Sequence, residues 1–526
     1  MSSATRFRCC RVSILLASLV SGCAMLMPVP NPNRLRAGVD IPQSWQQADE
    51  DTAQMDAQDW AQWWQRLEDA HLNALVEQGL ANAPDVRLAQ ARLRQARESR
   101  GLAAAGWWPN LDGSASANHA PDSETVYQAG FDASWEPDIF GNVSHGVAAA
   151  NADLAAQAAR LEHAQVSLAA EIALNYVEYR LGQERSRIAC RNALSQAETF
   201  DMTRWRAQAG LVTELDVEQA RTALAQTRAT IPGLQNAQVA NLNRLDVLLG
   251  TPPGTLMARD RERLAQASSN AHAESLPGVD LKRFFDLNGP APCSLLETYP
   301  QIHEQSGLGD LLTVPQPLPR APEAIAVGIP AEAIHRRPDV RAAEQALAAE
   351  IARTRAALAD RFPRLRLTGS FGWQDSHFAT LGGSETIVRS LVASLSASLF
   401  DGGRIRHRIG QQDAVAEQAL VSYEQTLLRA LEDVENALSS YASGKRREIE
   451  RIEAAEAARN AAQLASQMYQ AGLVDFQQVL DAQRTLLSAE DGLASARGDI
   501  LRAVVQLYKA LGGGWTPVDT DGNPAR

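Results

Sequence analysis

The two halves of this chain repeat one pattern, and this duplication limits the possible folds more than any other feature of the sequence. Residues 83–87 (APDVR) match residues 337–341 (RPDVR), an offset of 254 positions (338 − 84 = 254). Further along, residues 210–213 (GLVT) match residues 472–475 (GLVD), an offset of 262 (472 − 210 = 262). The first offset recurs at residues 109 and 363 (363 − 109 = 254) and the second at residues 250 and 512 (512 − 250 = 262), and offsets kept over such distances mark an internal repeat. Each half is therefore expected to fold as the same unit.

Each repeat is predicted to contain a helix, two β-strands, a long helix and a further helix. Hydrophobic residues occupy every second position in the strand segments, as in residues 127–135 (YQAGFDASW). The strands are expected at about 109–120, 125–136, 363–375 and 387–400. Segments of about ten residues suit tilted membrane strands, but they suit the half-buried strands of a soluble sandwich equally well. The strand pattern alone leaves both alternatives open.

The number of strands sets a further condition. Four strands cannot close a barrel, because about eight strands is the small limit. An open sheet edge is not tolerated in lipid, where its backbone groups find no partner. If these strands cross a membrane, several copies of the chain must therefore share one barrel.

Long helices are predicted between the strands and the glycines that match between the repeats. Residues 142–209 contain no proline, and a helix of that length would extend for roughly 100 Å. Leucines recur every seven residues within it, which is typical of coiled-coil packing. Gly210 is expected to end this helix as the turn of a helical hairpin. Pro232 lies in the return helix of the first repeat only, and is predicted to kink it.

The N-terminus has the features of an export signal that ends in a lipid attachment site. Three arginines precede the apolar run of residues 12–20, which is too short for a permanent membrane helix of roughly 20 residues. Residues 20–23 (VSGC) resemble a bacterial lipobox, which implies removal of residues 1–22 and lipid on the sulfur of Cys23. An ordinary secretory signal with a chance cysteine is the alternative. Alanine rather than aspartate after Cys23 favours the outer membrane, by analogy with such lipoproteins.

Composition and motifs exclude several classes of function. The chain has 526 residues, with 50 Lys and Arg against 62 Asp and Glu, a formal net charge of −12. This balance argues against nucleic acid as a partner, since such binding needs clustered cations. A mean hydropathy of −0.25 excludes a helical integral membrane protein. The sequence contains no HExxH, P-loop, CxxC or nucleophile-elbow motif. No catalytic residue, no metal site and no cofactor is therefore expected, apart from the covalent lipid on Cys23.

Five cysteines divide between processing and structure. Cys9 and Cys10 leave with the signal, and Cys23 is the expected lipid site. Cys190 and Cys293 remain in an oxidising compartment, where a disulfide between them is possible. Because Cys190 lies in a long helical pattern, a lone buried thiol is the favoured interpretation.

Seven segments occur in a defined order along the chain: 64–86 (WQRLEDAHLNALVEQGLANAPDV), 135–141 (WEPDIFG), 175–176 (NY), 210–217 (GLVTELDV), 337–340 (RPDV), 400–403 (FDGG) and 472–481 (GLVDFQQVLD). In this order, from about residue 63 to residue 514, the chain resembles the TolC-type outer-membrane efflux lipoproteins, a NodT-like family of RND efflux systems. The resemblance implies a mainly α fold with a small membrane β-barrel. It also implies a homotrimer, in which a twelve-stranded barrel continues into an α-helical tunnel with an equatorial belt.

The resemblance also implies a function. Members of the family are the outer-membrane channel components of tripartite pumps, passive ducts that export drugs and toxic compounds from the periplasm. The expected partners are a periplasmic adaptor, an inner-membrane RND-type pump and outer-membrane lipid. The alternative is a lipid-anchored periplasmic coiled-coil adaptor or scaffold without a pore.

Two sets of working residues follow from the resemblance. Adaptor docking is expected at the two hairpin tips: Gly210, Leu211, Val212, Thr213, Gly472, Leu473, Val474 and Asp475. The periplasmic gate is expected at Asp481, Asp216 and Tyr469. The alternatives are that these glycines are only turn residues and that Asp481 is an ordinary exposed helical acid. Gln478 stands where the family has a second gate acid, and Val474 where it has a basic partner, so the gate would depend less on ion pairs.

The signal features, the internal repeat and the resemblance together predict six segments. They are a signal peptide (1–22), a lipidated extension (23–60), repeat one (61–255), a long linker (256–330), repeat two (331–516) and a tail (517–526). The linker is longer than is usual in the family and rich in Pro, Ser and Gly. By position it belongs to the equatorial belt, as a wrapped loop, a partner site or a disordered segment.

Overall fold

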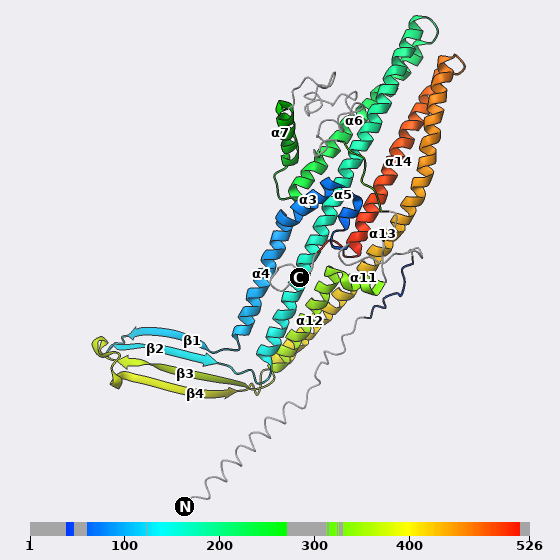
Figure 1. The fold of residues 1–526 in the computed structure, drawn as a ribbon. Helices are drawn as coiled ribbons and strands as arrows, with labels where there is room; N and C mark the ends of the chain where they lie inside the picture. Colours follow the sequence, from blue (N-terminus) through cyan, green and yellow to red (C-terminus); the bar gives the residue numbers. More distant parts are fainter. Residues whose placement is uncertain are drawn as a thin grey trace, which may run out of the picture. The chain divides into compact units, whose positions relative to one another are not determined.

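The computed structural model describes residues 38–46, 60–121, 124–270, 312, 315–322, 325 and 330–515, with the side chains of 264–270 left out. The expected signal peptide, Cys23, Cys293, the tail and most of the 256–330 linker lie outside the described residues. What is described is mostly helical, with one β-sheet (Figure 1).

The same order of elements occurs twice along the chain. In the first half it comprises α4 (Pro84–Ala105), β1 (Asn110–Asn118), β2 (Val126–Trp135), α5 (Asn142–Gln208) and α6 (Glu214–Leu248). In the second half it comprises α12 (Pro338–Ala359), β3 (Arg364–Asp375), β4 (Ile387–Ser396), α13 (Arg404–Gln470) and α14 (Phe476–Ala510). The long helices α5 and α13 both contain 67 residues, and α6 and α14 both contain 35. The strands lie within the segments where period-two alternation placed them.

Six further described elements accompany the repeats: η2 (Trp63–Leu67), α3 (Ala70–Asn82), α7 (Thr255–Asn270), α11 (Pro330–Arg336) and two short 3₁₀ turns (η4, Phe378–Thr380; η5, Ser384–Thr386). Helix α6 continues through Pro232. Among the described helices, none combines the length and the hydropathy that a membrane crossing needs.

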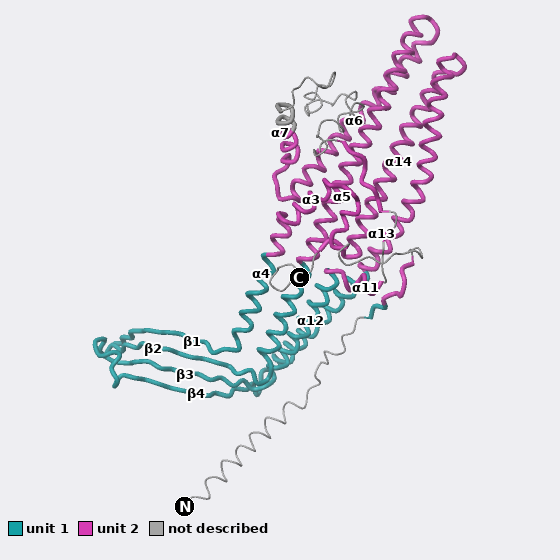
Figure 2. The backbone as a smooth tube through the Cα atoms, viewed as in Figure 1, with its two compact units in different colours: residues 1–40, 91–160, 339–428 teal, residues 41–90, 161–338, 429–526 magenta. Residues whose placement is uncertain are grey.

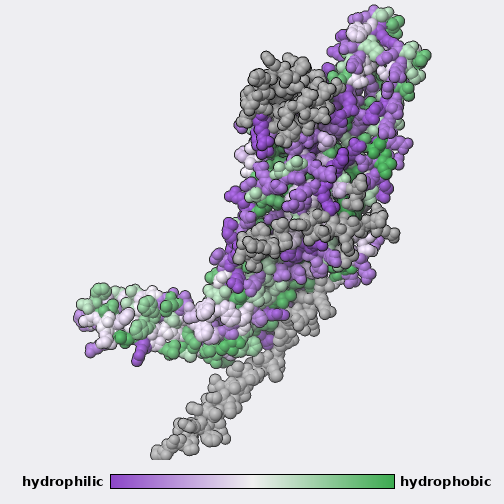
Figure 3. Space-filling model, in the orientation of Figure 1, coloured by the Kyte–Doolittle hydropathy of each residue, from purple (hydrophilic) through white to green (hydrophobic). Residues whose placement is uncertain are grey.

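The four strands form one antiparallel sheet in the order β1-β2-β3-β4. The register places most large apolar side chains on one face: Leu111, Phe131, Trp135, Leu365, Leu367, Phe371, Trp373, Leu391 and Leu395. The other face carries mainly polar ones: Asn110, Asp112, Ser114, Asp132, Ser134, Thr368, Ser370, Ser390 and Ser394. Figure 3 shows hydrophobic patches over the sheet, whereas the helices are mostly hydrophilic outside. Within the described chain, β1 and β4 each pair along one edge only.

An aspartate starts each of the two long helices. The carboxylate of Asp138 accepts hydrogen bonds from the backbone N–H groups of Val143 (3.0 Å) and Ser144 (2.7 Å). Asp401 accepts from Gly403 (2.9 Å) and Ile405 (2.8 Å) in the same way. Such caps satisfy amide groups that the first helical turn leaves free. Partial burial works to raise the pKa of Asp138, but the hydrogen bonds from Ser144 and Val143 outweigh it and lower that pKa.

The chain divides into two compact units, and each unit draws on both repeats (Figure 2). The first unit takes the described parts of 1–40, 91–160 and 339–428, which include the sheet; the second takes those of 41–90, 161–338 and 429–526. This division differs from the expected one into repeats at 61–255 and 331–516. The units cut across the repeats because elements of the two repeats meet in space: β2 of the first repeat pairs with β3 of the second, and α6 contacts α14.

A buried polar network lies in the core of the second unit. Arg180 is fully buried; its Nε donates to the hydroxyl of Tyr176 (2.8 Å) and its guanidinium donates to the carbonyl of Leu312 (3.1 Å). The Tyr176 hydroxyl in turn donates to Asp69 (2.7 Å), the N-cap residue of α3. Burial raises the pKa of Tyr176, which keeps this hydroxyl protonated. The network joins α3, α5 and the linker residue Leu312.

Cys190 corrects one expectation. Its side chain is 2% exposed, as the helical pattern predicted, but it is disulfide-bonded rather than a free thiol. The other cysteine of this bond lies outside the described residues. The favoured interpretation of Cys190 as a lone buried thiol was therefore wrong, because helical periodicity reports burial and carries no information about a distant sulfur.

Candidate functional site

Two helical hairpins end in tight turns of the same geometry. Helices α5 and α6 are joined at residues 209–213, and α13 and α14 at residues 471–475. Gly210 and Gly472 have φ of +71° and +75°. An added Cβ would meet no atom within 4 Å at either glycine, so it is the left-handed backbone, not a lack of space, that favours glycine. The glycines are therefore turn residues, and this role is compatible with docking at the same tips.

The tips expose apolar side chains. Leu211 and Leu473, which correspond between the repeats, are 73% and 72% exposed. Val212 and Val474 instead pack against a buried cluster below the turns. Large exposed apolar side chains at the end of a rigid hairpin favour contact with another protein. Of the residues expected to dock the adaptor, the two leucines are the large apolar ones that the structure presents outward.

Thr213 and Asp216 bond to each other. The backbone N–H of Thr213 donates to Asp216 (2.9 Å), and the backbone N–H of Asp216 reaches the Thr213 hydroxyl (3.4 Å). This is a capping box, which holds the first turn of α6. Asp475, the residue of the second tip that corresponds to Thr213, makes no side-chain cap hydrogen bond. Asp216 therefore has a local structural role in addition to the gate role that the sequence predicted for it.

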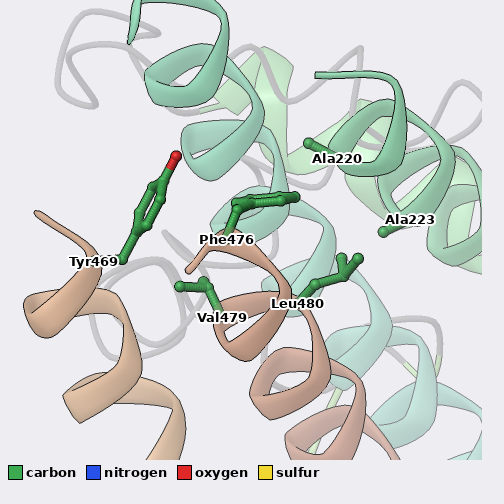
Figure 4. Close-up of a cluster of buried hydrophobic side chains, with 6 residues drawn as sticks. All are labelled: Ala220, Ala223, Tyr469, Phe476, Val479 and Leu480. Atoms are coloured by element: carbon green, nitrogen blue, oxygen red, sulfur yellow. The ribbon is translucent and has the colours of Figure 1, made fainter. Parts of the chain in front are cut away.

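Tyr469 lies inside the hairpin pair rather than on its surface. It is 4% exposed and packs with Ala220, Ala223, Phe476, Val479 and Leu480, as Figure 4 shows. Its ring centroid is 5.7 Å from that of Phe476. Among the described residues its buried hydroxyl has no hydrogen-bond partner. In this arrangement Tyr469 acts as a packing residue between α6, α13 and α14.

Arg206, which the sequence analysis missed, joins the two hairpins. Its guanidinium donates to the carbonyls of Tyr469 (2.8 Å) and Gln470 (2.7 Å), the last residues of α13. It also lies 4.6 Å from the centre of the Tyr469 ring. The last carbonyls of a helix have no partner within the helix, so a guanidinium group there supplies hydrogen bonds. Its positive charge also interacts favourably with the negative end of the helix dipole. The only sequence signal is a basic residue in the last turn of α5, which does not reveal a partner on another helix.

Asp481 lies on α14 with its side chain 60% exposed. It accepts a hydrogen bond from Gln477 (3.1 Å), and Arg484 is 3.7 Å away. Both of these partners are on α14 itself, so the described chain does not bring Asp481 together with Asp216 or Tyr469. The three residues predicted for the gate occupy the same hairpin ends without forming one cluster in a single subunit.

Ion pairs hold α14 to the neighbouring helices further from the tips. Asp491 accepts two hydrogen bonds from Arg185 of α5 (2.7 and 3.0 Å), and these bonds raise the pKa of that arginine. Glu490, with a side chain 6% exposed, pairs with Arg459 of α13 (2.9 Å) and Arg191 of α5 (3.6 Å). Among the described residues no group of three His, Cys, Asp or Glu side chains is placed to hold a metal.

The profile of the outer membrane efflux protein family matches residues 75–251 and 329–513, most of both repeats. The chain belongs to this family. The pyoverdine export outer membrane protein OpmQ of Pseudomonas aeruginosa is 28% identical over 515 residues, which cover 95% of this chain and 96% of that protein. The outer membrane protein OprJ of the same organism is 28% identical over 520 residues, with 96% of each chain covered.

A solved structure agrees with this assignment. The outer-membrane channel OprN is 33% identical and superposes with a TM-score of 0.75, over 92% of this chain and 98% of that one. The resemblance to outer-membrane efflux factors is thereby confirmed, and so is the outer-membrane location.

Proposed function

We propose that this efflux protein is the passive outer-membrane duct of a tripartite pump, built by three copies of the chain around one axis. Small molecules, including drugs and toxic compounds, would pass through it from the periplasm to the exterior. The duct itself performs no catalysis, and its energy comes from an inner-membrane RND-type pump that a periplasmic adaptor connects to the hairpin tips. A lipid on Cys23 would anchor each copy.

The observation that carries this proposal is the four-stranded sheet with two open edges and two unlike faces. Its strands contain 9, 10, 12 and 10 residues, the length of tilted membrane strands. On the outer strand β4, Leu391 is 84% exposed and Leu395 is 63% exposed. Unpaired backbone groups cost several kcal/mol each in hydrocarbon. Pairing β4 of one copy with β1 of the next removes both edges and leaves the apolar face toward lipid.

The closed form follows from the strand count. Two copies would supply eight strands, which enclose little more than side chains, whereas three copies supply twelve and leave room for a channel. The polar face of the sheet, with Asp112, Asp132, Ser370 and Ser390 in one row across the strands, would then line water.

The relatives' names also bear on cargo. OpmQ is described as a pyoverdine export protein, and the Pseudomonas putida relative TtgI as part of a toluene efflux pump. Such unlike cargoes among proteins of one fold suggest that the pump and adaptor select what is exported. We therefore propose that this chain forms the duct and does not select the compounds that pass through it.

The test uses the full-length protein from outer-membrane fractions. We expect an oligomer that resists SDS until it is heated, a mass of three subunits in detergent, and single-channel currents in planar bilayers. A monomer that fractionates with the inner membrane and conducts nothing would refute the duct and favour the adaptor or scaffold without a pore.

A further inference from the structure

A cavity of about 570 Å³ lies between α5, α6 and α14 in the second unit. Its polar lining includes Arg185, Gln196, Thr227, Arg484 and Asp491, and its apolar lining includes Ala189, Ala223, Leu234 and Leu487. A volume of this size suits a drug-sized organic molecule, and a mainly apolar lining with a few polar groups is typical of such sites.

Helical geometry places this cavity on the face of α14 that carries the proposed gate residue. Asp481, Arg484, Ser488 and Asp491 follow one another at spacings of three and four, so they form one stripe along the helix. The last three line the cavity. A second cavity, of about 700 Å³, uses Leu493, Arg497 and Leu501 on the other side of α14, together with linker residues 317–321. The two sides of α14 are therefore distinct, and the smaller cavity belongs to the gate side.

The side-chain amide of Gln196 gives independent evidence that a ligand binds in the cavity. Its side chain lines the cavity and is 3% exposed, and among the described residues its buried Oε1 meets no hydrogen-bond donor. A buried acceptor without a donor is unfavourable because it has lost its hydrogen bonds to water, so a group that donates to it is expected. A ligand with an N–H or O–H group would meet that need.

The charges of the lining indicate the rest of the ligand. Arg185 and Asp491 neutralise each other through their two hydrogen bonds. Arg484 is 49% exposed, and among the described residues its one ion-pair contact is the long one of 3.7 Å to Asp481. The cavity thus keeps one guanidinium group for an incoming anion, and Arg binds carboxylates well in paired geometry.

Gly233 of α6 belongs to the lining of the cavity. An added Cβ there would meet no atom within 4 Å. The preceding residue, Pro232, has no N–H, so the carbonyl of Arg228 loses its usual helical bond. Helix α6 continues through Pro232, so Gly233 stays in line with the other lining residues of α6.

We propose that this cavity is a solute-binding site beside the gate, which takes amphipathic organic acids that also carry an N–H or O–H donor. The donor pairs with Gln196, the carboxylate with Arg484, and the apolar body with Leu234 and Leu487. That the site faces the channel lumen rests on the proposed duct function. The binding itself does not.

The test titrates dansylglycine, which has a carboxylate, a sulfonamide N–H and an aromatic body, into the purified full-length protein in detergent. We expect saturable fluorescence enhancement with a blue shift. Gln196→Leu and Arg484→Gln should each weaken binding about tenfold. Dansylamide, which lacks the carboxylate, should bind the unaltered protein about tenfold more weakly. Arg497→Gln, on the opposite side of α14, should bind normally.

A second pair of variants guards against misfolding. Gly233→Leu adds a bulky side chain at a lining position of the cavity that has open space around it, and should abolish binding. Gly146→Leu makes the same change at another open helical glycine, away from the cavity, and should bind normally. Equal binding by the Gly233 and Gly146 variants, or none by the unaltered protein, would overturn the site.

Single-channel recordings on the same preparation separate this inference from the duct. Block of the current at the concentration that saturates fluorescence supports a site in the lumen. Binding without block overturns that placement. A preparation that neither forms a trimer nor conducts refutes the duct, while its fluorescence titration still decides whether the cavity binds.

Discussion

Replacing Arg206 with alanine should loosen the end of α13. The side chain makes two charge-assisted hydrogen bonds, to the carbonyls of Tyr469 and Gln470, and one cation–π contact with the Tyr469 ring. Bonds of this kind contribute about 1.5–3 kcal/mol when buried, and an exposed cation–π contact about 0.5–1 kcal/mol. Arg206 is half-buried and water replaces part of the loss, so we expect a local cost of about 2–3 kcal/mol.

Hydrogen exchange at the second hairpin tip measures this cost. The backbone N–H groups of Gly472 and Leu473 donate to the carbonyls of Tyr469 (3.0 Å) and Met468 (2.9 Å), and these bonds open when the end of α13 frays. A loss of about 2–3 kcal/mol should speed their exchange roughly 30- to 150-fold, since about 1.4 kcal/mol is a factor of ten. Exchange in the middle of α13 should stay unchanged.

Arg204→Ala is the matched control. Arg204 lies two residues before Arg206 on α5. Its ion pair is with Asp201 of the same helix (3.2 Å), and both side chains of this pair are well exposed. Exposed pairs contribute about 0–1 kcal/mol, so exchange at the tip should change little. If the Arg206 and Arg204 variants exchange at the same rate, the link between the hairpins that we describe does not exist.

Three other predictions follow from the sheet, the gate and the helix cap. Leu391→Lys places a charge on the apolar face of β4 and should destabilise the barrel in the membrane by about 2–4 kcal/mol. Ser390→Lys, on the polar face, should be tolerated. The yield of SDS-resistant oligomer in unheated samples measures both effects. Asp481→Ala should raise channel conductance and antibiotic leakage, and an unchanged open probability would make Asp481 an ordinary exposed acid. The stability that Asp138 confers is present above its ordinary pKa of about 4 and is lost as pH falls through its lowered folded value. Acid titration of Asp138→Asn, followed by circular dichroism, should therefore show a weaker dependence on pH below about 4, and a curve parallel to that of the unaltered protein would contradict it.

The sequence was sufficient for features that depend on local pattern. Alternation in 127–135 located β2, because each strand has one apolar face. The long proline-free runs located α5 and α13, and Gly210 and Gly472 located the turns because the backbone there needs positive φ. These features depend on residues close together in the chain, where periodicity carries the information.

Features that depend on distant partners could not be read in the same way. Arg206 and Glu490 look like ordinary helical charges, and only packing of separate helices shows what they bind. The disulfide state of Cys190 and the unsatisfied Gln196 are hidden for the same reason. The burial of the Tyr469 ring among apolar side chains is hidden too, because a pattern of residues does not fix which way one ring turns.

The open edges of the sheet have a consequence for biogenesis. In the proposed trimer, insertion into the bilayer and association of the subunits must be a single event, since a lone copy would carry two rows of unsatisfied amides into hydrocarbon. Each newly exported chain must wait at the membrane surface until neighbours arrive, so the yield should rise steeply with expression level. A copy with a damaged β4 would also spoil the partners it meets, and a mixed population should behave as dominant negative.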